Sequence, residues 1–323
     1  MLNWLISISP LVKILLLTAH FQKTLTKYNK SLQFETRIFD KLRLMKEQDL
    51  IKIIKEQTIS EFLGDDCAYL KELGIVVTQD NFIEDVHFKQ EWATPYQIGY
   101  KAAAVNISDI LASGAKPEYI TIGLSMPDLG ENFVKEFYSG IESGSYGAKV
   151  IGGDITGADK IFVSITAIGS AKGRKISSRK NAKAGYVVVS RGKYGESSKG
   201  FQELQEGIRE TEAIKAHLEP KLDVEFSKNI AENIKEDYAM MDTSDGLADA
   251  LFQIAKTSGV TIKTNYIEGM FGAEDYHLVA AVPKWENKED IIAYVYPFDG
   301  AYLQIGDKKY LDYDELGLYK HWS

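Results

Sequence analysis

A series of aspartates lies where predicted strands and helices begin or end. They occur in the segments GDDCA, VVTQD, NISD, IGGD and MDTSDG, as Asp65, Asp66, Asp80, Asp109, Asp154, Asp242 and Asp245. Several have Gly or Ser as neighbours, and such small residues let a ligand or an ion approach the backbone. Carboxylate oxygens are preferred ligands of Mg²⁺, which usually lies between protein carboxylates and substrate phosphates. The pattern therefore indicates phosphoryl transfer assisted by metal ions that neutralise the phosphate charge.

Any one of these aspartates also has a structural explanation. An aspartate after a strand is usually a cap or a turn former, at odds of about three in four. Asp109 is more informative, because the helix that carries it is otherwise mostly small and apolar and places Asn106 on the same face. A carboxylate in such surroundings needs a partner or a metal ion.

Two further segments allow both a structural and a functional interpretation. Ser244 opens a predicted helix as its N-cap or, with Asp245 as a metal ligand, as part of a phosphate site at the helix N-terminus. The IGGD segment forms either a tight turn or a surface where backbone N–H groups meet a nucleotide. The sequence has no Walker A motif and no GxGxxG before a VAIK-like strand, so a kinase here belongs to neither lineage.

The elements that must position these residues fall into two groups. The first is an α+β unit, for which the order of elements predicts an antiparallel sheet. Its strands are expected at residues 74–80, 118–126, 148–151 and 160–169, and its helices at 94–112 and 131–144. The second is an α/β unit, with strands at residues 186–190, 260–264 and 276–282 and helices at 199–210, 223–234 and 244–258. A basic, polar stretch at residues 173–185 separates the groups and predicts domains at residues 45–180 and 181–323.

Residues 1–44 fit neither unit. The apolar run at residues 5–19 is interrupted by Pro10 and Lys13 and is shorter than the ~20 apolar residues of a membrane-spanning helix. No basic segment precedes this run and no cleavage site follows it, as a signal peptide would require. Residues 1–44 are therefore expected to be a poorly ordered extension or an upstream mis-start, with a membrane anchor at odds of roughly one in ten.

The overall composition limits the classes of function. The formal net charge of -8 argues against nonspecific binding to nucleic acid, which requires a basic surface. The single cysteine, Cys67, excludes an intramolecular disulfide and fits a cytoplasmic protein. Five scattered histidines, without a CxxC or HExxH motif, argue against a zinc site. Neither a nucleic acid nor a membrane is expected as a partner.

Taken in order, the motifs resemble the thiamine-monophosphate kinase family of the aminoimidazole-ribonucleotide synthetase-like superfamily. The matching segments lie between Leu50 and Val282 and are GDDCA, TQDNFIEDVHF, KAAAVNISDILASGAKP, VIGGDITG, SITAIG, a basic segment ending in Arg179, MDTSDGLADAL and GAEDYHL. The resemblance implies a two-domain α+β fold, in which an N-terminal sheet domain forms a homodimer and a C-terminal α/β domain closes over the nucleotide. It also implies Mg²⁺-dependent, in-line transfer of phosphate from ATP to thiamine monophosphate, without a side-chain nucleophile.

The resemblance further implies roles for individual residues. Mg²⁺ ligands are expected at Asp66, Thr78, Asp80, Asp109, Asp154, Asp242 and Asp245. Contacts with ATP are expected at Tyr138, Gly152, Gly153, Arg179 and Ser244. Contacts with thiamine monophosphate are expected at His87, Glu274 and Tyr319.

The sequence also departs from the family pattern in places. Gln79 stands where the family usually has Thr or Ser, so one metal contact is expected to be lost or routed through water. The segment between Val260 and Gly272 is shorter than in the family, which trims the substrate end of the second domain.

One alternative is another ATP-using enzyme of the superfamily, such as a selenophosphate or aminoimidazole-ribonucleotide synthetase. The other is a protein that binds nucleotide or thiamine phosphate without turnover.

Overall fold

The computed structural model describes residues 47–58, 60 and 62–318, in two compact units. The smaller unit comprises Met1–Ser60 and Lys320–Ser323, and its described secondary structure is helix α2 (Glu47–Gln57). The larger unit, Glu61–Tyr319, contains every other described element. The expectations for residues 1–44 and for Tyr319 lie outside the described residues.

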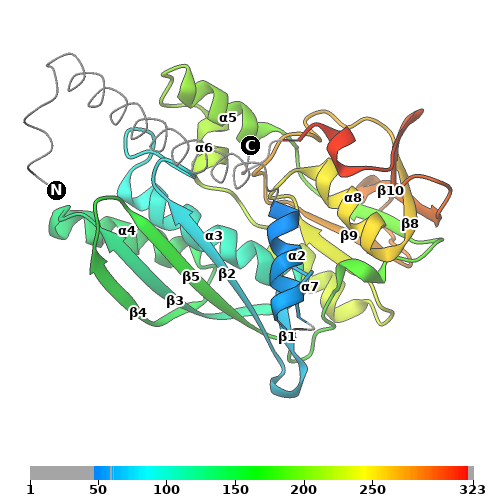
Figure 1. Cartoon of the computed structure of the whole chain (residues 1–323), viewed down its shortest axis with the longest axis horizontal. Helices are drawn as coiled ribbons and strands as arrows, with labels where there is room; N and C mark the ends of the chain where they lie inside the picture. The colour runs from blue at the N-terminus through cyan, green and yellow to red at the C-terminus, as the bar shows by residue number, and fades with distance from the viewer. Residues whose placement is uncertain (1–46, 59, 61, 319–323) are drawn as a thin grey trace, which may run out of the picture. The chain divides into compact units, whose positions relative to one another are not determined.

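The first sheet of the larger unit has five strands in the order β1-β2-β5-β3-β4 (Figure 1). The strands are β1 (Ala68–Leu70), β2 (Ile75–Ile83), β3 (Lys116–Met126), β4 (Lys149–Gly157) and β5 (Phe162–Ser170). The helices of this part are α3 (Pro95–Ala112) and α4 (Gly130–Gly144). Neighbouring strands pair antiparallel except β3 and β4, which run parallel. The expected antiparallel sheet is therefore wrong at this one pairing, because α4 connects the two strands as a crossover.

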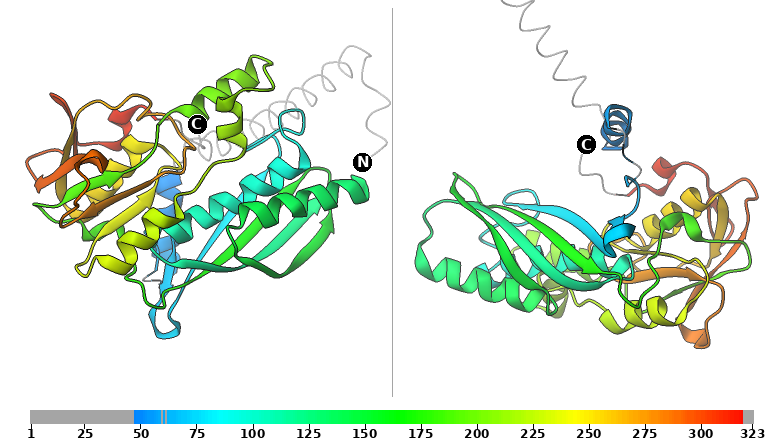
Figure 2. Two further views of the ribbon diagram at one scale, coloured as in Figure 1. Left: turned by 180° about the vertical axis from the view of Figure 1, so that it is seen from behind. Right: turned by 90° about the horizontal axis from the view of Figure 1, so that it is seen from below.

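Helices α3 and α4 lie side by side against one face of the sheet (Figures 1 and 2). Helix α3 begins as predicted, because Thr94 and Gln97 form a capping box and Pro95 occupies the first turn. The two helices approach backbone to backbone, since a Cβ atom at Gly140 would lie only 1.9 Å from the main-chain oxygen of Tyr96. This contact fixes α3 relative to α4.

The other face of the sheet is only partly buried. Buried and half-buried residues alternate along β5, and β4 is exposed along its whole length. Val77, Ile168 and Tyr119 are in register across β2, β5 and β3 on this face, and Tyr119 is 42% exposed. The sheet thus presents an apolar row on the face opposite α3 and α4.

The second sheet has seven strands in the order β12-β11-β8-β10-β6-β9-β7. The strands are β6 (Val187–Ser190), β7 (Ala239–Asp242), β8 (Val260–Thr264), β9 (Leu278–Val282), β10 (Ile291–Pro297), β11 (Leu303–Ile305) and β12 (Lys308–Tyr310). The helices are α5 (Glu196–Gln205), α6 (Glu212–Leu218), α7 (Val224–Asn233) and α8 (Leu247–Ser258). All pairings are antiparallel apart from β8 with β11. The two sheets give the expected α+β fold.

Most of the predicted elements are present, with shifted ends. Helix α8 begins at Leu247, after Gly246 with a φ of 103°, so the interpretation of Ser244 as the N-cap is wrong. The boundary expected between residues 180 and 181 falls inside the short helix η2 (Arg179–Asn181) and stays a prediction. The sequence does not predict β1, α6, β7, β10, β11 or β12. Of these, β1, β7, β11 and β12 have only three or four residues. Among the described residues, no helix combines the length and apolarity needed to cross a membrane.

Candidate functional site

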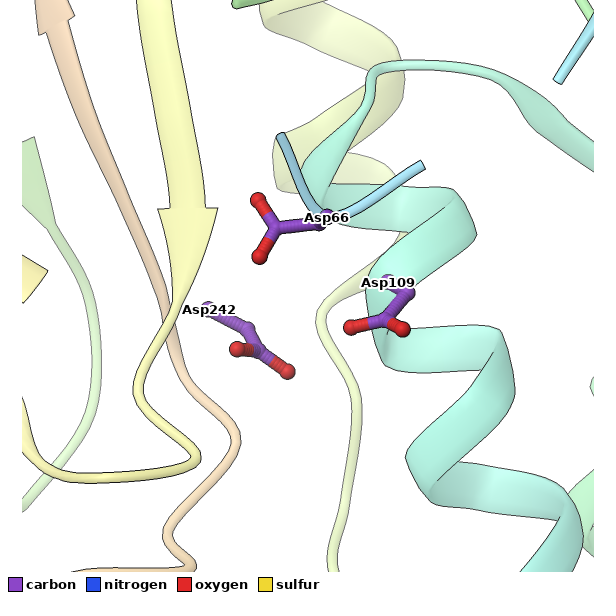
Figure 3. Close-up of side chains that lie close together, drawn as sticks. All are labelled: Asp66, Asp109 and Asp242. Atoms are coloured by element: carbon purple, nitrogen blue, oxygen red, sulfur yellow. The ribbon is translucent and has the colours of Figure 1, made fainter. Parts of the chain in front are cut away.

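Three aspartates from separate parts of the chain converge in the larger unit (Figure 3). Asp66 precedes β1, Asp109 lies in α3 and Asp242 ends β7. One carboxylate oxygen of each lies within 4.8 Å of the other two. Three carboxylates this close supply only oxygen ligands, which is the donor set that a hard divalent cation prefers. The structure thus brings together three of the predicted metal ligands.

Strand β2 adds a hydroxyl and another carboxylate beside this cluster. Thr78 Oγ1 lies 2.7 Å from Asp109 Oδ2 and 3.0 Å from the main-chain oxygen of Asp66. The main-chain N–H of Asp80 donates to Asn106 Oδ1 at 3.0 Å, so α3 holds β2 at this point. Burial, with a further contribution from the charge of Asp66, raises the pKa of Asp80. Asp80 therefore lies within electrostatic reach of the cluster.

Polar groups from α3, from the turn after β7 and from η2 contact Asp242 and Asp66. Ser108 Oγ donates to Asp242 Oδ2 at 2.5 Å, and the main-chain N–H of Ser244 donates to Asp242 Oδ1 at 3.4 Å. Arg179 forms an ion pair with Asp66. Because a guanidinium matches a phosphate as well as it matches a carboxylate, Arg179 is suited to bind a phosphate next to the cluster.

The neighbouring Asp65 has a structural role instead. Its carboxylate accepts hydrogen bonds from Ser178 Oγ at 2.7 Å and from the main-chain N–H of Arg179 at 2.8 Å. These bonds hold the start of η2 against the segment that carries Asp66. Asp65 thereby positions Arg179 rather than facing the other carboxylates.

The clustered carboxylates repel one another at a buried place. Burial is the largest cause that raises the pKa of Asp109 well above its usual range, followed by the charges of Asp80, Asp242 and Asp66. Burial and the charge of Asp66, opposed by the hydrogen bond from Ser108, raise the pKa of Asp242 to about 7. Like charges in a desolvated site are costly without a counterion. A divalent cation would remove this cost, so the donor set and its electrostatics both fit Mg²⁺.

The IGGD segment is not part of this cluster within one chain. Gly152, Gly153 and Asp154 lie on the edge strand β4, which is three strand spacings, or about 14 Å, from β2. Gly153 has a packing explanation, because a Cβ atom there would lie 1.9 Å from the main-chain oxygen of Ile122. Asp154 is paired in register with Gly123, on the face away from α3 and α4.

Tyr138 likewise has no described contact with the carboxylate cluster. It lies in α4, is half-buried, and its ring packs edge-on against Phe137 with the ring centroids 5.4 Å apart. Burial raises the pKa of its hydroxyl. A contact between Tyr138 and ATP stays a prediction.

The turn between β7 and α8 brings Asp245 close to a buried carboxylate that sequence reasoning missed. Burial and then the charge of Asp245 raise the pKa of Asp249 to about 6, and Gln253 Nε2 donates to Asp249 Oδ1 at 3.1 Å. Ser244 connects this turn to a distant segment, since its main-chain oxygen accepts a hydrogen bond from the N–H of Glu274 at 2.7 Å. The turn therefore links the carboxylate cluster to the predicted substrate residues.

Two of the predicted substrate residues, His87 and Glu274, influence each other. His87 Nδ1 accepts from the main-chain N–H of Ile83 at 3.0 Å, and its ring stacks on Phe82. Burial raises the pKa of Glu274, but the charge of Lys101, followed by smaller contributions from the neighbouring His217 and His87, lowers it below its ordinary value overall.

Lys101 and His217 are therefore residues that sequence reasoning missed. A signal for Lys101 was present in the sequence, because it is a lone cation in the same apolar helix that makes Asp109 informative. His217 lies in α6, which the sequence does not predict, and no local pattern singles it out.

Gln79 does not have the consequence expected from the sequence. Its side chain bonds to Ser164 Oγ and Thr166 Oγ1, both at 3.2 Å, on the partly buried face of the sheet. Thr78 and Asp80 point to the opposite face, because successive residues of a strand alternate. The expected loss of a metal contact at Gln79 is therefore wrong.

A cavity of about 470 Å³ adjoins the cluster on the side of Asp66. Tyr69, Ile176 and Met240 give it apolar walls, and Ser178 adds a hydroxyl. Its volume and mixed lining are typical of a small-molecule site. The buried Cys67 also borders it, but burial and the nearby Asp109 and Asp66 raise the pKa of the thiol, so it stays protonated.

The chain is similar to known proteins in sequence and in fold. The family described as AIR synthase related protein, N-terminal domain, matches residues 64–171. The thiamine-monophosphate kinase of Aquifex aeolicus is 32% identical over 275 residues, which cover 76% of this chain and 88% of that protein. The enzyme of the same name from Bacillus subtilis is 34% identical over 280 residues, covering 75% and 86%. The structure of AaThiL complexed with AMPPCP and TMP matches at a TM-score of 0.75 and 29% identity, over 85% of this chain and 97% of that one.

Proposed function

Because this chain belongs to the thiamine-monophosphate kinase family, we propose that it transfers the γ-phosphate of ATP to thiamine monophosphate. The products are thiamine diphosphate and ADP. One observation carries the proposal: Asp66, Asp109 and Asp242 converge within 4.8 Å, with the Arg179 guanidinium paired to one of them. A related protein has been captured with AMPPCP and TMP, which supports the same pair of ligands here.

Mg²⁺ is the cation that this site is proposed to hold. Asp66, Asp109 and Asp242, with Thr78 beside them, supply hard oxygen donors, and Asp80 is close enough to raise the pKa of Asp109. Asp245, in the turn that follows Asp242, is proposed as a further ligand. Mg²⁺ bound there would neutralise phosphate charge and hold the phosphates in line.

The chain's own residues orient the reactants. Arg179, anchored through its main-chain N–H to Asp65, directs its guanidinium toward the phosphates, and the adjoining cavity accommodates the nucleoside. Direct attack by the substrate phosphate oxygen requires no protein nucleophile. The protonated Cys67 thiol, which donates to the Asp109 main-chain oxygen at 3.3 Å, argues against the selenophosphate synthetase alternative, which relies on a reactive cysteine.

The functional unit is proposed to be a homodimer. The apolar row of Val77, Ile168 and Tyr119 lies on the partly buried face of the first sheet, where a second copy would bury it further. Asp154 lies on that face and away from the cluster of its own chain. The second copy is therefore the proposed source of Asp154, Gly152 and Gly153 for each nucleotide site. A cytoplasmic location, expected from the single cysteine, also stays a prediction.

A coupled ADP-release assay tests the activity. ADP should appear only when ATP, Mg²⁺ and thiamine monophosphate are all present, and thiamine diphosphate should accumulate in equal amount. Tight binding of thiamine monophosphate without ADP release would instead favour the binding protein. Release of ADP without any dependence on thiamine monophosphate would point to another substrate of the superfamily.

A further inference from the structure

A buried lysine, Lys101, lies on the helix that carries Asp109 but outside the carboxylate cluster. Lys101 precedes Asp109 in α3, and its side chain is only 2% exposed. Its Nζ is 3.3 Å from Glu274 Oε2 and 3.4 Å from His217 Nε2. A desolvated ammonium persists in a fold only when it is paired, and these two groups are its partners.

The bonding pattern fixes the state of His217. An ammonium is only a donor, so His217 Nε2 must accept from Lys101 and the ring proton must be on Nδ1. That nitrogen is 3.0 Å from Ser197 Oγ and 3.4 Å from Glu274 Oε2. Burial, and then the charge of Lys101, lower the pKa of His217 to about 3, so the ring is neutral near pH 7. The group therefore holds one positive charge, on Lys101, and one negative charge, on Glu274.

Glu274 is held at one oxygen and at its backbone. Both described contacts of its carboxylate, with Lys101 and with His217, use Oε2, while the side chain remains 30% exposed. Its main-chain N–H donates to Ser244, and its φ of 64° is unusual for a residue other than glycine. Tyr276, two residues later, also has a positive φ, of 54°. Strained backbone of this kind persists where the surroundings enforce it, often at a ligand site.

We propose that Lys101 is a positioning residue that fixes Oε2 of Glu274 so that Oε1 faces the thiamine moiety of the substrate. That moiety has a cationic thiazolium ring and an aminopyrimidine that donates hydrogen bonds, and a carboxylate oxygen suits both. His217 supports the arrangement as a neutral spacer between Lys101 and Ser197. The inference rests on the proposed function, since it takes Glu274 as a contact of thiamine monophosphate.

Energetics favour a positioning role over a purely stabilising one. Replacing a buried ion pair with apolar side chains of similar volume is often neutral or stabilising, so such a pair is a weak source of stability. What Lys101 provides is orientation, because it ties Glu274, on a segment next to the second sheet, to the helix that carries Asp109. The metal cluster and the substrate carboxylate thereby share one rigid element.

The substitution Lys101→Met tests the proposal, because it removes the ammonium and keeps an unbranched side chain. The KM for thiamine monophosphate should rise about 30-fold, as is common when one partner of a buried charged pair is lost. The KM for ATP and the kcat should change by about twofold or less, because contacts made equally in ground and transition states affect only KM. Lys101→Arg, which keeps the charge, should recover part of the affinity.

Arg174→Met is the matched control. Arg174 is also a buried cation, 6% exposed, with its Nε 3.5 Å from Glu232 Oε1, and none of its described contacts is with Glu274 or the carboxylate cluster. This variant should keep the wild-type KM for thiamine monophosphate. An equal rise in both variants would show a general effect of removing a buried charge and would overturn the proposal.

A double-mutant cycle with Glu274→Gln shows whether Lys101 acts through that carboxylate. In the Glu274→Gln background, Lys101→Met should raise the KM by less than about threefold, because the two residues form one unit. If the KM of the double variant rose by the product of the two single-variant factors, the proposal would be overturned. Should Lys101→Met fail to fold, Lys101→Arg and His217→Gln provide the same cycle.

Calorimetric titration with thiamine monophosphate separates failure of this inference from failure of the proposed function. Normal turnover with unchanged affinity in Lys101→Met would overturn the inference and leave the function in place. Absence of wild-type turnover, with binding that Lys101→Met weakens, would overturn the function and support the inference. A wild-type protein that neither binds nor phosphorylates thiamine monophosphate would overturn both.

Discussion

At the scale of single residues, the charged neighbours of a buried ionisable side chain determine its role. Asp109 and Lys101 lie on one helix, and both are desolvated. Asp109 faces other carboxylates, which raise its pKa further. Burial lowers the pKa of Lys101, and the facing Glu274 opposes this shift and favours the charged form. Asp65, by contrast, is exposed and accepts two hydrogen bonds. Only the carboxylates around Asp109 require an added cation. Asp109 is therefore the most informative residue to change.

The substitution Asp109→Asn should lower kcat by at least about 100-fold, because it removes a charge that is preorganised around the transferring phosphate. Single-turnover and steady-state ADP release both measure this. Asp223→Asn is the control, since Asp223 caps α7 through the N–H of Phe226 and asparagine caps equally well. A near-normal rate in Asp109→Asn would mean that the metal assignment is wrong.

At the scale of elements, the contact between α3 and α4 sets the position of the site. Cβ atoms added at Gly99, Gly140 or Gly144 would each come within about 2.2 Å of main-chain atoms on the facing helix. The sheet and α4 therefore hold α3 from two sides, and α3 supplies Asp109, Ser108 and Lys101. A small shift of this helix would displace all three side chains together.

Gly140→Ala should lower the free energy of unfolding by about 2 kcal/mol, because the new methyl group would lie against the main-chain oxygen of Tyr96. Denaturant unfolding followed by circular dichroism measures the loss. Gly157→Ala should change stability by less than about 0.5 kcal/mol, since no atom of the described residues lies within 4 Å of its added Cβ. Equal losses in the two variants would contradict backbone-to-backbone packing of the helices.

At the scale of the whole molecule, the carboxylates link stability to pH and to Mg²⁺. The folded-state pKa is raised for Asp80, Asp109, Asp242 and Asp249, to about 7 for Asp242 and about 6 for Asp249. A raised acid pKa stabilises the fold below the unfolded pKa of about 3.9, and that stability is lost as pH rises through the folded value. These four carboxylates therefore contribute less and less stability to the metal-free protein as the pH rises from about 4 to about 7, while His217, whose folded pKa is lowered to about 3, acts in the opposite direction below its unfolded pKa of about 6.5.

Thermal unfolding in EDTA and in Mg²⁺ checks this linkage. The Tm in EDTA should fall as the pH rises from about 5.5 to about 8, and Mg²⁺ should raise the Tm more at the higher pH. The physical reason is that the cation binds the ionised carboxylates, whose repulsion is largest there. A Mg²⁺ effect that is equal at both pH values would contradict the cluster as the metal site.

The proposed homodimer predicts complementation between inactive variants. Mixed dimers of Asp109→Asn and Asp154→Asn chains contain one site with both aspartates intact, so activity should recover to about a quarter of wild type after subunit exchange. Ile168→Glu, which places a charge in the apolar row, should abolish this recovery and yield monomers in light scattering. A mixture that stays inactive would show that Asp154 serves the site of its own chain.

The sequence by itself determined the local features of this protein. Alternation and capping predicted β2, β3, β5 and α3, because strand and helix periods depend on near neighbours. The placement of aspartates at the ends of predicted elements singled out a larger set that includes Asp66, Asp109 and Asp242, before their positions were known. Short strands such as β11 and β12 escaped prediction, because three residues carry too little periodicity to indicate a strand.

Only the tertiary structure decided which of these residues meet. The order of the strands places Asp154 at the far edge of the sheet, while packing of α3 against β2 and β7 brings Asp109 to Asp66 and Asp242. Packing of α3 against one face of β2 places Thr78 at the cluster and leaves Gln79 on the other face, and the pairing of Lys101 with Glu274 joins residues 173 positions apart. Such contacts depend on how whole sheets and helices pack, which no local pattern of residues contains.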